Sequence, residues 1–396
     1  MSKERFETVL DYGFSKLRIG TFDNDHPNNK FFLNEEFQNN FSFENSSEKI
    51  HKLVKKLEKK QNTHLNDVNI MIDTPDFFCV DIGLKKNFNN RLVKSNDIKH
   101  LLNITNSLIK NNYSNIKIIH FIITKITIDK KDLEFFPEKD FYCYELIFEA
   151  KFICLPDKLF DELFEKLKTK YLSIKKIYCT SYIKSFCFKD SFENYENKFF
   201  LDIGYEKSCL AIYKKNKLKL IKYIQLGGNH ITKDISKIFK ISLNQAEQIK
   251  KSLGNLNLTF SDKTNEESTN KNESFPNIIF DNKIEIELLK RVVFARIDEI
   301  MNLIFDNING LDFIESSNDS ILVFTGEGSK ILNKNSIIPN NKFSNFKELN
   351  FFNENTTLVC DSGYKYIFMD KPNEVTLVPK RSDKYGFFEK MFNFFK

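Results

Sequence analysis

The chain has 396 residues, a net charge of +6 and no tryptophan. This length can bury a large core, and we expect two lobes or more. The positive charge is mild and dispersed, which argues against a dedicated nucleic-acid binder with Lys and Arg gathered on one element. The seven cysteines show no metal-binding spacing, and most lie in apolar runs (Cys79, Cys154, Cys209, Cys360), so we expect buried free thiols in a reducing compartment.

The ends and the hydropathy of the chain bear on its location. The N-terminus begins with charged residues and continues into a strand-like run, so no signal peptide is expected. No apolar run approaches the ~20 residues that span a bilayer. We therefore expect the body of the protein in the cytosol.

Apolar periodicity predicts the elements in chain order. In the first part we expect a strand ending at Leu10, a strand over 17–22, a helix over 47–59 and a buried strand over 68–72. An α+β insert over 81–155 follows, with one helix that has Ser95 as its N-cap and two strands, 116–128 and 141–155. Later helices are expected over 159–167, 233–239, 242–253 with Gly254 as the cap, and 284–308. We also expect a mobile polar loop over 262–276 and a strand near 357–360.

A strand-like run that ends in Asp-x-Gly occurs twice, about half a chain apart. The first copy is Asp11-Tyr12-Gly13, leading to Lys16, and the second is Asp202-Ile203-Gly204. A carboxylate at a strand end can hold the water shell of a phosphate-bound Mg²⁺ ion. Glycine two residues later permits a positive φ and brings N–H groups against phosphates. Together with a third, later turn at Gly326-Glu327-Gly328, this order is typical of an actin-type fold that clamps a nucleotide between two halves.

Three segments carry a family resemblance. They are 226–235 with its Gly-Gly-x-x-Ile-Thr-x-Asp-Ile pattern, 245–250 with Ala-Glu-x-Ile-Lys, and 295–300 with Arg-x-x-Glu-Ile. These segments resemble FtsA, the actin-like bacterial cell-division protein that tethers FtsZ to the membrane, and the resemblance runs over nearly the whole chain. It implies an α/β, actin-like (ribonuclease H-like) two-lobed ATPase fold with an inserted α+β 1C subdomain. The implied divisions are 1–80 (1A), 81–155 (1C), 156–195 (1A), 196–230 (2A), 231–291 (2B), 292–378 (2A) and 379–396 (linker and amphipathic helix).

The resemblance implies ATP with Mg²⁺ between the lobes. The implied nucleotide residues are Asp11, Gly13 and Lys16 in the first phosphate loop, Asp202 and Gly204 in the second, Glu247 and Lys250 at the ribose and adenine, and Gly326 and Gly328 at the adenosine turn. Asp11 and Asp202 would hold Mg²⁺ through water. No catalytic residue is assigned, and we expect at most a weak ATPase that serves mainly as a nucleotide-binding scaffold.

Three departures from the family pattern affect this nucleotide site. Tyr205-Glu206-Lys207 stands where the second loop has Gly-Gly-Thr, Phe14 replaces a Ser or Thr, and Glu327 replaces a glycine. Lost glycines reduce backbone freedom near the phosphates, and Glu206 adds negative charge there, which Lys207 could offset. Weakened nucleotide binding and a degenerate pocket kept for its shape are both open interpretations.

The last ten residues, 387–396, are predicted to form a membrane anchor. At about 100° per residue, their apolar side chains fall within an arc of roughly 160°. The expected membrane residues are Phe387, Phe388, Met391, Phe392, Phe394 and Phe395, with Lys390 beside them. A core helix is the alternative, and the family resemblance favours reversible attachment to an anionic membrane.

The resemblance also implies partners and a location. These are the FtsZ C-terminal tail at the 2B region, copies of the chain in actin-like filaments, and other divisome proteins at 1C, on the cytoplasmic face of the inner membrane at the division site. Between 231 and 291, Lys233, Lys237, Lys240, Lys250 and Lys251 lie among Ile235, Ile238, Phe239 and Ile241. This mix suits a peptide with acidic and apolar residues, although a solvated lysine face is the plain alternative.

Two other functions compete with this interpretation. A sugar or acetate kinase of the same superfamily needs a positioned general base, for which we find no carboxylate motif. A pilus-assembly adaptor with an FtsA-like fold would share the lobes and the insert. Neither alternative explains the C-terminal amphipathic pattern.

Overall fold

The computed structural model describes residues 5–26, 28–37, 43–168, 172–255, 284–306, 308, 319–332, 343, 345–371 and 373–375. The predicted loop over 262–276 and the predicted amphipathic helix over 387–396 lie outside these residues. Within the described ranges, no helix is long and apolar enough to cross a membrane.

The first lobe is built on a five-stranded sheet. Its strands are β1 (Phe6–Tyr12), β2 (Lys16–Asp23), β3 (Lys30–Glu36), β4 (Asp67–Ile72) and β9 (Ser173–Cys179), in the order β3-β2-β1-β4-β9. β1 runs antiparallel to β2 and parallel to β4, and β4 runs parallel to β9. The expected helix over 47–59 is confirmed as α1 (Phe43–Gln61), which packs its apolar face on this sheet. β3 was not predicted.

The second lobe repeats this topology. Its strands are β10 (Asn197–Ile203), β11 (Ser208–Lys214), β12 (Lys217–Ile224), β13 (Ser320–Thr325) and β14 (Glu348–Phe351), in the order β12-β11-β10-β13-β14. β10 again pairs antiparallel with the next strand and parallel with β13. The repeated Asp-x-Gly run is therefore the start of a repeated fold.

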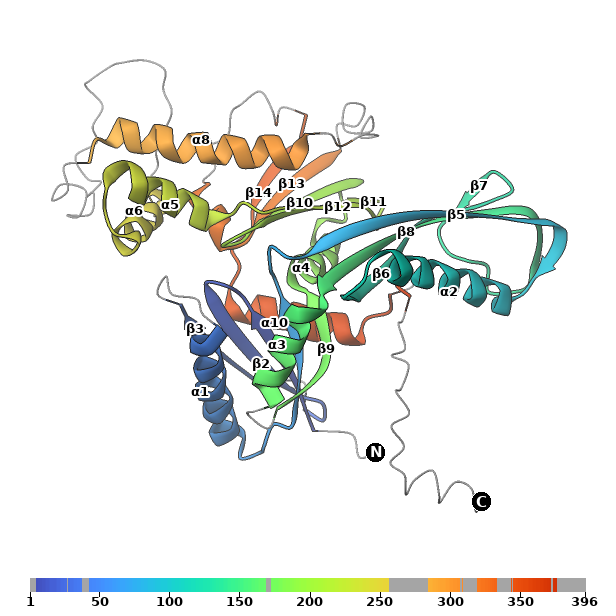
Figure 1. Ribbon diagram of the computed structural model, residues 1–396, viewed down its shortest axis with the longest axis horizontal. Coiled ribbons are helices and arrows are strands. Elements are labelled where there is room, and N and C mark those ends of the chain that lie inside the picture. The colour runs from blue at the N-terminus through green and yellow to red at the C-terminus, as the bar shows by residue number, and fades with distance from the viewer. Residues whose placement is uncertain are drawn as a thin grey trace.

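Alternate residues of β10 serve two cores, because successive side chains of a strand point to opposite faces. Phe199 and Leu201 pack with α5 (Gly228–Phe239), α6 (Leu243–Asn255) and α8 (Ile286–Phe305), which cover the outer face in Figure 1. Phe200 packs in the core that the second lobe shares with the first, together with Tyr182 of α4 (Thr180–Phe188). Both lobes thus meet in one apolar core.

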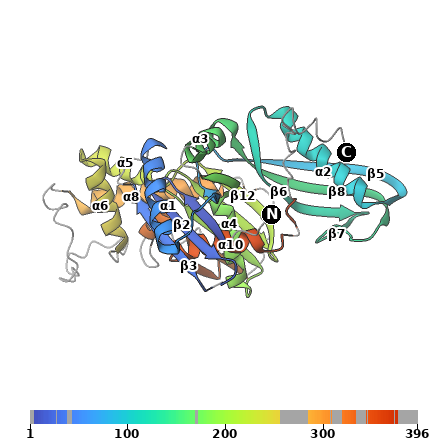
Figure 2. The same cartoon turned by 90° about the horizontal axis from the view of Figure 1, so that it is seen from below.

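The insert forms a separate layer of sheet and helix that projects from the first lobe (Figures 1 and 2). It contains β5 (Phe78–Val93), α2 (Ser95–Asn112), β6 (Ile116–Ile128), β7 (Lys131–Leu133) and β8 (Phe141–Pro156), in the sheet order β5-β8-β6-β7. α3 (Asp157–Lys168) then returns the chain to the first lobe and confirms the helix expected over 159–167.

The expectation of two strands in the insert was wrong, because β5 and β7 were missed. In the first half of β5, Val80, Ile82 and Leu84 alternate with exposed residues and pack on the core of the insert, whereas the second half is mostly polar and exposed. Its strand conformation comes from pairing with β8, interrupted by an irregularity between Asn87 and Arg91. Ser95 is also not the N-cap of α2: the cap is Lys94, whose backbone N–H donates to Asp97 Oδ2 at 2.9 Å.

The strand expected near 357–360 is instead the start of α10 (Thr356–Phe368). The Asn355 side chain caps this helix by accepting a hydrogen bond from the Leu358 N–H at 2.8 Å. α10 packs on the first sheet, so closely that a Cβ at Gly363 would lie 2.7 Å from atoms of Val9 and Met71. The predicted range 292–378 assigns α10 to 2A, although the helix packs on the first lobe. The domain divisions stay predictions.

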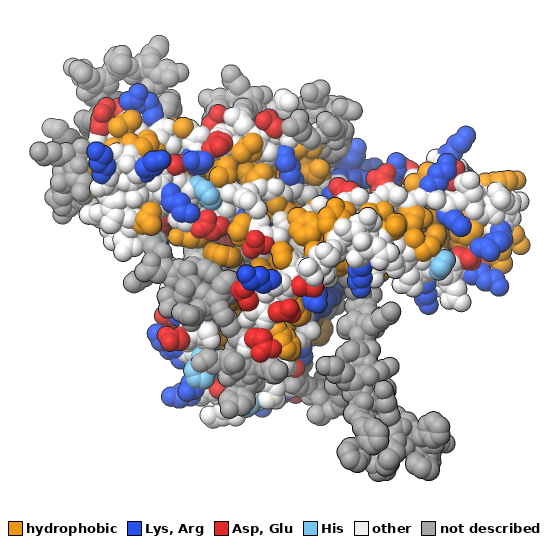
Figure 3. Space-filling model, in the orientation of Figure 1, with side chains coloured by type: hydrophobic (Ala, Val, Ile, Leu, Met, Phe, Trp, Pro, Cys, Tyr) orange, Lys and Arg blue, Asp and Glu red, His pale blue; other side chains and the backbone are white. Residues whose placement is uncertain are grey.

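Two further expectations concerned Gly254 and the cysteines. Gly254 was expected to cap a helix after residue 253 and instead lies inside α6. The seven cysteines are free thiols as expected, with Cys154, Cys209 and Cys360 buried and Cys79 half-buried. On the face drawn in Figure 3, basic and acidic side chains are interspersed over both lobes and the insert, in line with the dispersed charge of the sequence.

Candidate functional site

The two Asp-x-Gly loops fold into matching turns. The N–H of Gly13 donates to the carbonyl of Lys16 at 3.2 Å, and the N–H of Gly204 donates to that of Lys207 at 2.9 Å. Neither glycine has a positive φ, so the predicted role of φ was wrong at both positions. What each loop requires is space: a Cβ at Gly13 would lie 2.8 Å from the Lys16 carbonyl oxygen.

Gly326 is the one described glycine with a positive φ, 88°. A Cβ here would lie 2.3 Å from Asp202 Oδ1 and 2.4 Å from the Ile203 carbonyl oxygen. The Gly326 turn therefore rests directly against the second loop. The first turn of α5 is also hydrogen-bonded to this loop, since the Gly228 N–H donates to the Gly204 carbonyl at 2.9 Å.

A cavity of about 360 Å³ lies where these turns face the first lobe. Five of the predicted nucleotide residues line it: Lys16, Gly204, Glu247, Lys250 and Gly328. Ser15, Glu36 and Phe37 contribute from the first lobe, and Tyr205, Gly228, Glu327 and Lys330 from the second. Asp11, Gly13, Asp202 and Gly326 are not among the lining residues, so the structure places them behind the cavity wall.

Glu247 and Lys250, one turn apart on α6, join α6 to α5. The buried Lys250 Nζ donates to the Gly228 carbonyl at 3.0 Å and to Thr232 Oγ1 at 2.9 Å, and it lies 2.6 Å from Glu247 Oε2. Burial lowers the pKa of Lys250, against the effect of Glu247. Lys250 thus holds Glu247 at the cavity wall.

The first-loop carboxylate is paired with an arginine. Asp11 is 2% exposed, and it accepts from Arg18 Nη1 at 2.7 Å and from Thr180 Oγ1 at 3.0 Å. Arg18 also donates through Nη2 to Glu327 Oε1 at 2.9 Å. Because Glu327 follows β13 in the second lobe, Arg18 connects the two lobes.

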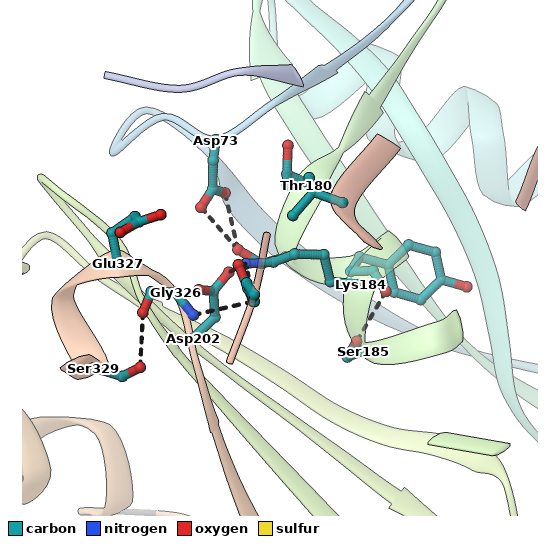
Figure 4. A network of polar contacts seen from close by, with 12 residues as sticks. Asp73, Thr180, Lys184, Ser185, Asp202, Gly326, Glu327 and Ser329 are labelled. Atoms are coloured by element: carbon teal, nitrogen blue, oxygen red, sulfur yellow. Dashed lines mark hydrogen bonds and ion pairs between the residues drawn. The ribbon is translucent and has the colours of Figure 1, made fainter. Parts of the chain in front are cut away.

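The second-loop carboxylate is paired with a lysine. Lys184 Nζ, on α4, lies 3.0 Å from Asp202 Oδ2 and 2.8 Å from Glu354 Oε1, and all three side chains are buried. Glu354 in turn accepts from the Gly326 N–H at 3.1 Å. Figure 4 shows Lys184 reaching toward Asp202 beside the Gly326 turn. Burial opposes the charge of Lys184, but Asp202 and Glu354 outweigh it and raise the pKa of this lysine.

A third buried cation forms an ion pair between the lobes in the same region. Buried Lys207 forms an ion pair with Asp73, which follows β4, and its Nζ lies 4.2 Å from the ring centroid of Tyr223. Ser181 Oγ donates to both Asp73 oxygens, at 3.0 and 2.9 Å. Burial opposes the charge of Lys207, yet Asp73 raises the pKa of Lys207. The second loop is thereby joined to the first lobe.

These pairs bear on the predicted magnesium site. A hydrated Mg²⁺ needs carboxylates that face a space large enough for its waters. Asp11 and Asp202 instead are buried, are paired with Arg18 and Lys184, and do not line the cavity. The residues present therefore do not fit Mg²⁺, although the cavity keeps residues of both phosphate loops.

Lys207 was identified from the sequence, whereas Arg18 and Lys184 were not. Both missed cations stand inside buried runs, Arg18 within β2 and Lys184 within α4. A charge inside an apolar run is the signal that could have found them, since buried charges are normally paired.

Comparison with known proteins confirms the resemblance over part of the chain. The family model described as "Cell division protein FtsA" matches residues 199–349. The chain is 29% identical over 119 residues to the cell division protein FtsA of Bacillus subtilis and 28% identical over 119 residues to that of Enterococcus hirae. These matches cover 28% and 29% of this chain, and only 24% and 25% of the two relatives.

Solved structures are similar over most of the chain. The PilM-PilN type IV pilus biogenesis complex contains a chain with a TM-score of 0.54 and 12% identity, and the match covers 89% of each chain. MreB 5 of Spiroplasma citri bound to AMPPNP has a TM-score of 0.45 and 12% identity, over 92% of this chain and 96% of that one. The fold is that of the actin-like ATPases, as the repeated sheet topology also indicates.

Proposed function

We propose, on the premise that this chain resembles FtsA, that it is a nucleotide-binding, actin-like adaptor that tethers FtsZ to the membrane during cell division. The observation that carries the proposal is the FtsA match over 199–349, which includes the second phosphate loop, α5, α6 and the Gly326 turn. Those are the elements that form the second-lobe wall of the cavity.

A nucleotide is the ligand that the cavity suits. Its volume of about 360 Å³ is within the usual range for small-molecule sites, roughly 300–1,000 Å³. Glu247 offers a carboxylate for ribose hydroxyls, and Gly328 lines the cavity with its backbone packed against Ile203 and Gly204. Lys16 and Lys330, which pair with Glu36 and Glu327 at the cavity, would turn to phosphates from opposite lobes. Hydrolysis is expected to be slow at most, because Asp11 and Asp202 are paired with protein cations.

The proposed site for the FtsZ tail is a groove between α5 and α8. Its volume is about 400 Å³, and its lining includes Ile238, Leu288 and Val292 together with Arg291 and Arg296. Ile238 is 47% exposed. Asp234 and Glu299 also line the groove and pair with Arg296. The groove therefore offers its apolar side chains and the charge of Arg291 to an acidic, apolar peptide.

The lysines proposed for this contact are fewer than the sequence suggested. Lys233, Lys237 and Lys240 are exposed on α5 or at its end, close to Ile238 in the chain. Lys250 is buried and bonded within the second lobe, and Ile235 is buried as well, so neither belongs to the surface.

A titration of the FtsZ C-terminal peptide tests the adaptor function. A fluorescent peptide should bind the wild-type chain, bind more weakly as salt rises, and bind at least tenfold more weakly to a Lys233→Glu, Lys237→Glu, Lys240→Glu variant. The matched control is Lys86→Glu, Lys99→Glu, Lys110→Glu, which makes the same charge change on exposed lysines of the insert. Equal affinity of the first variant contradicts the role assigned to the lysines of α5, and no binding by the wild type contradicts the adaptor function.

The membrane anchor is proposed for 387–396 from the apolar arc of these residues and the FtsA resemblance. The described chain leads there from the junction of the insert and the first lobe. The Ile123 N–H donates to the Asn373 carbonyl at 2.7 Å, and the Val375 N–H donates to the Phe121 carbonyl at 2.8 Å. The anchor would thus leave the body from a fixed point. Location at the cytoplasmic face of the inner membrane, filament formation and divisome contacts through 1C remain proposals of the same resemblance.

A pilus-assembly adaptor is the second candidate, because a chain of the PilM-PilN complex has the same fold over 89% of its length. At 12% identity this similarity shows the fold alone. Binding of the FtsZ peptide separates the two candidates. A small-molecule kinase, the remaining alternative, would consume ATP in the presence of a sugar or acetate, which a turnover assay decides.

A further inference from the structure

Three buried side chains, Arg18, Lys184 and Lys207, form what we call the cation clasp. Each of them pairs with a carboxylate of the opposite lobe: Arg18 with Glu327, Lys184 with Asp202, and Lys207 with Asp73. Arg18 and Lys184 extend from the first lobe, and Lys207 extends from the second. The lobes are thus connected at the phosphate loops by groups that belong to the chain itself.

The clasp occupies the positions that a metal ion would need. Asp11 accepts a hydrogen bond from Arg18 at 2.7 Å, and Asp202 lies 3.0 Å from Lys184 Nζ. The two aspartates are only 2% and 4% exposed, so neither has space for the water shell that Mg²⁺ retains. A cation brought to either carboxylate would have to displace a buried positive group that already neutralises it.

The cavity next to the clasp has its own positive groups for an anion. Lys16 lines it from the first lobe, where it pairs with the exposed Glu36 at 3.2 Å, and Lys330 lines it from the second, where it pairs with Glu327 at 2.6 Å. A phosphate would compete with these two carboxylates for the lysines. Lysine binds phosphate as a compact point charge and needs no metal in between. Chelation of the phosphates by Mg²⁺ would reduce the negative charge that these lysines meet.

We propose that the interlobe cavity binds its nucleotide without a divalent cation, and that the cation clasp replaces the metal as neutralising charge and as the link between the lobes. This inference rests on the proposed nucleotide binding. It also separates the chain from a metal-dependent ATPase, because the groups that would align a metal and a γ-phosphate are already paired.

Calorimetry with ADP and ATP tests the inference. The wild-type chain is titrated in EDTA and in excess Mg²⁺. We expect binding in EDTA, with an affinity equal to or greater than that in Mg²⁺. Binding that is tenfold or more tighter in Mg²⁺ overturns the inference but leaves the proposed nucleotide function standing. If the chain binds no nucleotide in either medium, both this inference and the proposed nucleotide binding are contradicted.

A second measurement needs neither a nucleotide nor a variant. If the aspartates bind no metal, the thermal midpoint of the free protein in millimolar Mg²⁺ should equal that in EDTA at matched ionic strength. A rise of the midpoint in Mg²⁺ contradicts the clasp, because a ligand that binds only the folded state stabilises it. MgCl₂ and CaCl₂ are compared so that a specific effect is separated from a general effect of divalent salt.

An Arg18→Met variant adds the opposite test. Removing the guanidinium leaves Asp11 as a buried carboxylate that a cation can neutralise. Mg²⁺ should then raise the thermal midpoint of the variant, although it does not raise that of the wild type. If the folded variant, checked by circular dichroism, responds to Mg²⁺ no more than the wild type does, Arg18 is not a substitute for the metal.

Discussion

Replacing Lys184 by methionine should destabilise the protein strongly, although the side chain keeps nearly the same length. Lys184 Nζ lies 2.8 Å from Glu354 and 3.0 Å from Asp202, and the side chains of the three residues are only 4–6% exposed. The variant would leave two buried carboxylates without their cation. Removing one partner of a buried ion pair typically costs about 3–5 kcal/mol, and we expect a loss of this size in the free energy of unfolding.

The pH dependence of this loss follows from the same geometry. Burial already raises the pKa of Glu354, against the opposing effect of Lys184. Without Lys184 the folded-state pKa values of both carboxyl groups should rise above their unfolded values, which are about 4. A group whose folded pKa is raised stabilises the fold at low pH and loses this effect as pH rises through the folded pKa. The variant should therefore be closer to the wild type at pH 5 than at pH 8.

Urea unfolding followed by circular dichroism at these two pH values measures the effect. Lys251→Met is the matched control, because its side chain is 65% exposed and its partner Glu247 lies 3.9 Å away, so little change is expected. A variant that combines Lys184→Met with Asp202→Asn and Glu354→Gln should recover much of the lost stability. Wild-type stability of Lys184→Met at pH 8, or a deficit that is the same at both pH values, would refute the buried ion-pair account.

Three further outcomes are expected. Gly326→Ala should lower the free energy of unfolding by about 1–3 kcal/mol or more, because φ is 88° and the new Cβ would lie 2.3 Å from a carboxylate oxygen. Gly83→Ala is the control and should be near neutral, because a Cβ there has no atom within 4 Å. Thermal unfolding of both variants measures the difference. Burial raises the pKa of Glu374, but the neighbouring His120 outweighs this effect and lowers it. The difference in stability between the wild type and Glu374→Gln should therefore be present at pH 7 and shrink as pH falls below about 4. A difference in urea unfolding that does not change with pH would contradict the pair. Deleting 387–396 should abolish co-sedimentation with anionic vesicles and leave the circular dichroism of the body intact, and equal pelleting of the truncated chain removes the anchor.

The fold was largely predictable, since its signals are local. Asp11 and Asp202 end apolar strands of ordinary length, and a repeat of that pattern half a chain apart indicates two equivalent lobes. Strand β5 was missed although Val80, Ile82 and Leu84 alternate with exposed residues in its first half. Its second half is mostly polar, and the conformation there depends on pairing with β8, which lies more than forty residues later at their closest pairs. The start of α10 was misassigned because a short apolar run fits a strand and a buried helix equally well.

The candidate site was predictable only in part. The resemblance implied one nucleotide site for nine residues, and five of these, Lys16, Gly204, Glu247, Lys250 and Gly328, line one cavity. It did not show that the acidic groups would be paired internally. Arg18 and its partner Glu327 are 309 positions apart in the sequence, and the Lys184 pair spans 170 positions. No local pattern indicates which distant acid a buried cation meets.

Recruitment of FtsZ to vesicles tests the proposed adaptor function most directly. Vesicles of phosphatidylglycerol and phosphatidylethanolamine are mixed with FtsZ from the same organism, with and without this chain, and are sedimented. We expect FtsZ in the pellet only when the full chain is present, and in the supernatant when the chain lacks 387–396 or carries Lys233→Glu, Lys237→Glu and Lys240→Glu. FtsZ that stays in the supernatant with the full chain, or that pellets equally well with the truncated one, would contradict the account.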